Sequence, residues 1–116
     1  MGWQSYHHVV VASTPDEAFA RARDQVDDLV LPHDVPSGTI LEQTGYEVVA
    51  LPTVDDLSDD ERGALCMGIP YARTQAFERR LAASDRARSY VRTSYRSWVA
   101  DLGDGTMVAF GWAHAG

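Results

Sequence analysis

Apolar and polar residues follow two different patterns at the start of the chain. Residues 5–12, "SYHHVVVA", are a run of aromatic and β-branched residues that predicts a strand. Three valines in a row would face both sides of a sheet, which is typical of a central strand. The following residues predict a helix from about Pro15 to Val30, with Thr14 as its N-cap and Glu17 completing a capping box. Its apolar stripe consists of Ala18, Ala22, Val26 and Leu29.

The middle of the chain alternates between breaks and short periodic segments. Two prolines and a glycine in "LPHDVPSG", residues 31–38, predict a loop. "TILEQTGYEVVAL", residues 39–51, predicts a strand with a tight turn or bulge at Thr44–Gly45. A second helix start follows, because Ser58 is a good N-cap and Glu61 stands three residues later, and Gly68 would end this short helix.

The last part of the chain predicts one more helix and a β-hairpin. Pro70 opens a helix that we expect to end near Arg88, with a strand from about Ser89. Two apolar strands flank "GDG" at 103–105, a strong turn signal. A spacing of four and three residues that runs from Phe77 through Ser84 and Arg88 to Leu102 leaves open a longer helix across residues 89–102. Residues there that are weak helix formers favour the strand: Val91, Thr93, Ser94 and Ser97.

These elements predict an α+β fold over residues 1–116 as a small single domain. The order is strand, helix, strand, two helices and two strands, which indicates a mostly antiparallel sheet with two or three helices packed on one face and a C-terminal β-hairpin. The last strand would lie at a sheet edge. An apolar edge carrying Met107, Phe110 and Trp112 favours pairing with another chain, so we expect that a homodimer can form there.

Charge is distributed unevenly. The chain has a net charge of −7, and all ten basic residues are arginine. Residues 1–61 hold 13 acids and 2 arginines, whereas residues 62–116 hold 8 arginines and 4 acids. The two halves could attract each other within the fold, or either could form an interaction surface. The acidic side chains that we expect to bind a partner are Asp24, Asp27, Asp28, Asp34, Asp55 and Asp56.

Composition also bears on where the protein acts. Cys66 is the only cysteine, so no intramolecular disulfide can form and a reducing compartment fits best. No run of 18 apolar residues is present, and the first residues lack the basic start and long apolar run of a signal peptide. We therefore expect a cytoplasmic protein without a membrane partner.

An arginine-rich stretch offers one alternative function. Arg88, Arg92 and Arg96 recur every four residues and so share one face of a strand, together with Tyr90 and Trp98. Such a face could bind phosphate while a base stacks on an aromatic ring, as in single-stranded nucleic-acid binding. A pI near 4.8 argues against tight non-specific DNA binding, so this alternative ranks second.

A small metal- or histidine-dependent enzyme is the third hypothesis. It would combine His7 or His8 with His33–Asp34 and Cys66. The two adjacent histidines point to opposite faces of a strand, and no spacing enforces a zinc site. The acids at 55–61 lack the pattern of a calcium loop and are explained by helix capping. We therefore predict no catalytic residue, no metal ligand and no cofactor.

The first hypothesis is a non-enzymatic protein that binds another macromolecule. Its acidic half would meet a basic surface on a partner protein, and acidic side chains would speed their association. Small inhibitors, immunity-type proteins and regulatory proteins, including phage-encoded ones, have this profile of size and charge. Neither the partner nor the pathway follows from the sequence.

Overall fold

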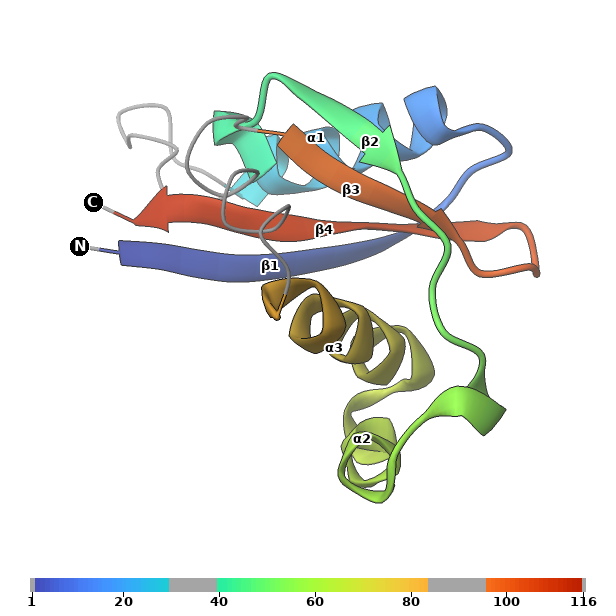
Figure 1. The fold of residues 1–116 in the computed structure, drawn as a ribbon. Helices are drawn as coiled ribbons and strands as arrows, with labels where there is room; N and C mark the ends of the chain where they lie inside the picture. Colours follow the sequence, from blue (N-terminus) through green and yellow to red (C-terminus); the bar gives the residue numbers. More distant parts are fainter. Residues whose placement is uncertain (1, 30–39, 84–95, 116) are drawn as a thin grey trace. The chain divides into compact units, whose positions relative to one another are not determined.

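The computed structural model describes the backbone of residues 2–29, 40–83 and 96–115, and the side chains of most of these residues (Figure 1). Its contacts divide the chain into two compact units. Unit 1 comprises residues 1–49 and 95–116, and unit 2 comprises residues 50–94. The predicted α+β class is confirmed, and the expectation that residues 1–116 form a single domain stays a prediction.

Unit 1 is a four-stranded mixed sheet with one long helix. Its elements are β1 (Gly2–Val11), α1 (Pro15–Leu29), the 3-10 turn η1 (Ile40–Glu42), β2 (Gly45–Val48), β3 (Arg96–Asp101) and β4 (Thr106–Ala115). The strand order is β1-β4-β3-β2. Strands β1 and β4, and β4 and β3, pair antiparallel, whereas β2 and β3 pair parallel. Parallel neighbours need a long crossover, and residues 49–95, which include unit 2, provide it.

Two expectations about sheet edges are wrong. β1 lies at an edge of the sheet and not in its centre. The valines on the face of β1 opposite α1 are exposed, Val9 by 41% and Val11 by 67%. β4 is an inner strand instead of an edge, because β1 and β3 pair on its two sides (Figure 1). Met107 and Phe110 are therefore buried and cannot form an exposed dimer edge.

The C-terminal hairpin is confirmed. Gly103 and Gly105 adopt positive φ values of 90° and 84°, which side-chain-bearing residues rarely adopt. The carboxylates of Asp101 and Asp104 accept hydrogen bonds from the backbone N–H groups of Gly103 and Thr106, which closes the turn. Because residues 96–101 form β3, the alternative of one helix through 89–102 is wrong for this part; residues 89–95 lie outside the described ranges.

Helix α1 begins where the sequence predicts. The backbone N–H of Glu17 donates to the Thr14 hydroxyl oxygen at 3.2 Å, which confirms the N-cap. The Glu17 side chain does not complete the capping box. It accepts from the Ser13 hydroxyl and pairs with Arg21 at 2.5 Å instead.

The core of unit 1 lies between α1 and one face of the sheet. Ala18 and Ala22 are fully buried, and their small side chains let the helix approach Ala109 of β4 and Val99 of β3 closely. On the opposite sheet face, the Trp98 ring centroid lies 5.6 Å from that of Phe110 and 5.3 Å from that of Trp112. The sheet is therefore apolar on both faces.

Only part of the strand predicted for residues 39–51 forms. Ile40 to Glu42 make a 3-10 turn, and Ile40 is fully buried in the unit 1 core. Gln43 is also buried, and its Nε2 donates to the Trp112 carbonyl oxygen at 2.8 Å. These two anchors turn the chain before β2 begins at Gly45.

Unit 2 is helical and consists of the 3-10 turn η2 (Val54–Asp56), α2 (Asp59–Gly63), the 3-10 turn η3 (Ala64–Met67) and α3 (Ile69–Ala82). The capping box at Ser58 and Glu61 is confirmed in both directions. Gly68 ends the segment at a φ of 112°, as the sequence predicts, although α2 and η3 replace one continuous helix. α3 ends at Ala82 with Ala83 as its C-cap, so the predicted end near Arg88 is wrong; residues 84–95 lie outside the described ranges. Leu57, Ala72 and Ala76 form the buried core of this unit.

Candidate protein-binding surface

Four exposed aspartates gather at the start of unit 2, in what we call the acidic segment, residues 54–60. They are Asp55, Asp56, Asp59 and Asp60. Two local structures hold this segment. The Thr53 hydroxyl donates to the Asp56 carboxylate at 2.6 Å, and the Ser58–Glu61 capping box starts α2. The hydrogen bonds from Thr53 hold the pKa of Asp56 below its usual value, so its charge persists to lower pH.

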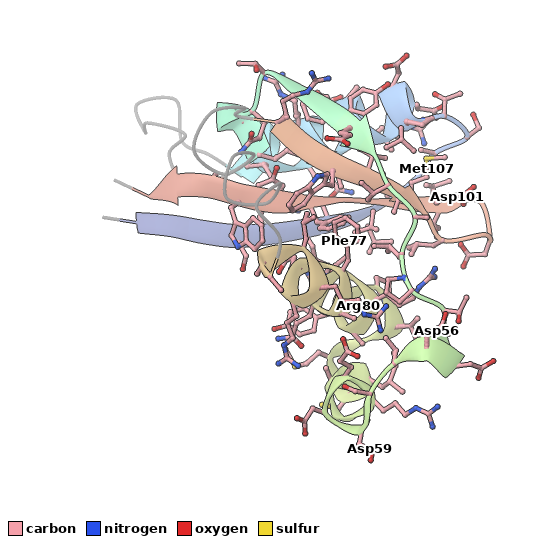
Figure 2. The ribbon with its side chains drawn as sticks, in the orientation of Figure 1. Asp56, Asp59, Phe77, Arg80, Asp101 and Met107 are labelled. Carbon is pink, nitrogen blue, oxygen red and sulfur yellow. The ribbon has the colours of Figure 1, made fainter. Side chains whose placement is uncertain are left out.

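Arg80 of α3 is the basic residue that contacts the acidic segment (Figure 2). Its guanidinium donates to the main-chain carbonyl oxygen of Asp56 at 2.8 Å and lies 3.7 Å from the Glu61 carboxylate. Neither contact is to an aspartate side chain. Arg80 therefore fixes the backbone of the segment and leaves the four aspartate carboxylates facing solvent.

Other described arginines of the chain also bind main-chain oxygens. Arg73 donates to the Pro52 carbonyl oxygen at 2.7 Å, and Arg96 to that of Tyr46 at 2.8 Å. Arg21 donates to the Val11 carbonyl oxygen as well as pairing with Glu17. Within the described ranges, no ion pair joins an arginine to an aspartate of the acidic segment. Arg80 and Glu61 form an ion pair between the two halves of the chain, and the positive charge of Arg80 also contributes to the lowered pKa of Asp56.

Apolar side chains are exposed in the same unit. Val54, inside the acidic segment, is 40% exposed, and Met67 and Ile69 on either side of Gly68 are 66% and 49% exposed. A groove of about 440 Å³ lies between the extended residues 50–52 and α3. It is lined by Ala50, Leu51, Pro52, Phe77, Arg80 and Leu81. Unit 2 therefore offers apolar as well as acidic contacts to a partner.

The acids predicted on the first helix are only partly described. Asp24 is exposed and borders a hollow of about 400 Å³ on unit 1. The hollow is lined by Phe19, Ala20, Arg23, Asp24 and Leu41, and the Arg23 guanidinium carbon lies 5.5 Å from the centre of the Phe19 ring. The side chains of Asp27, Asp28 and Asp34 lie outside the described part. Asp24 belongs to unit 1, whereas the acidic segment belongs to unit 2.

The arginine–aromatic alternative loses one of its members. Trp98 is 2% exposed, and its ring contacts Phe110 and Trp112, so it is a core residue and offers no stacking surface. Arg96 is exposed, and its guanidinium binds the Tyr46 carbonyl oxygen. Arg88, Tyr90 and Arg92 lie outside the described residues, so the ladder itself is not tested.

The histidines of β1 do not converge. Alternation along the strand puts His8 on the α1 face, where it stacks on Tyr6 with centroids 5.9 Å apart, and puts His7 on the other face. Burial lowers the pKa of both histidines below the usual value. Cys66 is exposed, and its thiol donates to the Gly63 carbonyl oxygen at 3.3 Å. Nowhere in the described ranges do three His, Cys, Asp or Glu side chains gather as metal ligands would; His33 lies outside them.

Sequence reasoning missed three features of these surfaces. Met67 and Ile69 are exposed on either side of Gly68, and the sequence predicts only a helix end at this glycine. The Arg23–Phe19 contact had a signal in their spacing of four residues on a helix. Burial also raises the pKa of Glu78 in α3 to about 7, and the sequence around it gave no sign of this.

Comparisons with known proteins do not assign this chain to a family. No protein-family model matches the chain, and neither curated proteins nor solved structures gave a significant match. None of the helices in the described ranges has the length and apolar content that a membrane span requires.

Proposed function

We propose that this chain is a non-enzymatic cytoplasmic protein that binds a partner protein through the acidic segment of unit 2. The partner would present a basic surface with apolar residues at its centre. Inhibitors, immunity-type proteins and regulatory proteins, including phage-encoded ones, act in this way without any catalytic group of their own.

One observation carries the proposal. Four neighbouring aspartates are exposed, and the arginine that contacts their segment binds a main-chain oxygen and Glu61 instead. Exposed carboxylates on one short segment, none of them in an ion pair within the described ranges, create a local negative potential, which steers a cationic partner and raises its association rate. Val54 within the segment, and Met67 and Ile69 elsewhere in the unit, add the apolar contacts that charge alone does not supply.

A pair of charge-matched variants tests the proposal. One variant changes the four aspartates of the acidic segment to asparagine, which keeps their size and removes four charges. The control variant makes the same change at four exposed aspartates of unit 1: Asp16, Asp24, Asp101 and Asp104. Both variants have the same net charge, so a difference between them reports on the position of the charges.

The measurement is partner binding at two salt concentrations. Immobilised wild-type protein captures partners from a cell extract, and the association rate of each captured protein is then measured with all three forms. We expect the unit 2 variant to slow association by at least tenfold at low salt, and the control variant to change it by less than threefold. Equal rates for wild type and the unit 2 variant, or a loss confined to the control, would overturn the proposal.

A nucleic-acid measurement separates this proposal from the arginine–aromatic alternative. Labelled single-stranded RNA and duplex DNA are titrated with the protein, and fluorescence anisotropy is read at low and physiological salt. We expect no binding at physiological salt. Binding that disappears when Arg88, Arg92 and Arg96 are changed together to alanine would favour the alternative instead.

A further inference from the structure

We draw no further inference here: the strongest candidate, the groove of about 440 Å³ between residues 50–52 and α3 in unit 2, carries no proposal because nothing in the structure shows what covers it.

Discussion

The hydroxyl oxygen of Tyr6 lies 3.1 Å from the position that a Cβ atom would take at Gly111, its partner across β1 and β4. Glycine at position 111 therefore makes room for the tyrosine on the α1 face of the sheet. The same register sets which residues of β1 face α1, so this pair bears on how the sheet packs against the helix.

We predict that Gly111→Ala lowers the free energy of unfolding by about 1–3 kcal/mol, because the added methyl group overpacks this contact and because residues with a side chain rarely adopt the φ of 155° at this position. Tyr6→Phe removes the closest atom and leaves the ring carbon at 3.5 Å, an ordinary contact. The cost of Gly111→Ala should therefore be smaller in a Tyr6→Phe background. Urea denaturation of the four proteins gives the comparison, and an unchanged cost in that background would show that the hydroxyl is not responsible.

Trp98 should behave as a core residue. We expect Trp98→Ala to cost about 3–5 kcal/mol of stability, because it leaves a cavity beside Phe110 and Trp112. Equilibrium urea denaturation followed by circular dichroism measures this cost. A loss below about 1 kcal/mol would mean that the ring is exposed in solution, which would revive the stacking role predicted for it.

The cap at Ser58 should stabilise the acidic segment. Its hydroxyl accepts from the Glu61 N–H at 3.2 Å, and Glu61 accepts in return from the Ser58 N–H at 2.8 Å. We predict that Ser58→Ala costs ~1 kcal/mol, whereas Ser58→Asp, another good N-cap, costs much less. Amide hydrogen exchange of residues 59–63 provides the measurement. Unchanged protection in Ser58→Ala would contradict the role of the cap.

Glu78 should make stability depend on pH. Burial raises its pKa to about 7 in the folded state, from 4.5 in the unfolded chain. Between these values the folded state keeps a proton that the unfolded state has lost, so the contribution of Glu78 falls as pH rises from 4.5 to 7. Below pH 4.5 both states are protonated, and above pH 7 the loss is complete.

The matched variant for this pH dependence is Glu78→Gln, which stays neutral at every pH. We expect the variant to gain stability relative to wild type as pH rises through this window, measured by urea midpoints from pH 4.5 to 8. A constant difference between the two proteins across the window would contradict the raised pKa.

Local signals in the sequence predicted most of the helices and strands, but they did not predict which strands pair. Thr14, Ser58 and Gly68 mark helix boundaries through contacts within a few residues, and all three lie where the sequence predicted a boundary. The prediction that β1 is a central strand was wrong, because strand order depends on contacts between residues distant in sequence. Here that contact is the pairing of Gly2–Val11 with Thr106–Ala115. Three valines in a row indicate a strand, yet they cannot show which side pairs.

The candidate site was predictable only in part. Asp55 and Asp56 were expected to be exposed binding residues, and exposure is what the structure gives them. Arg80 donates to the main-chain oxygen of Asp56 and not to the carboxylates of Asp55 and Asp56. This contact depends on how α3 packs beside η2, and no local sequence pattern predicts that packing. The alternative hypothesis was wrong about the exposure of Trp98. The alternation of side chains along a strand predicts which residues share a face, but it does not predict whether that face is buried.

The association rate of the captured partner with the two charge-matched variants tests the central claim most directly. If the acidic segment is the binding surface, changing its four aspartates to asparagine slows association at least tenfold at low salt, and the unit 1 control stays close to wild type. If both variants slow association equally, only net charge matters, and the assignment of binding to the acidic segment is wrong.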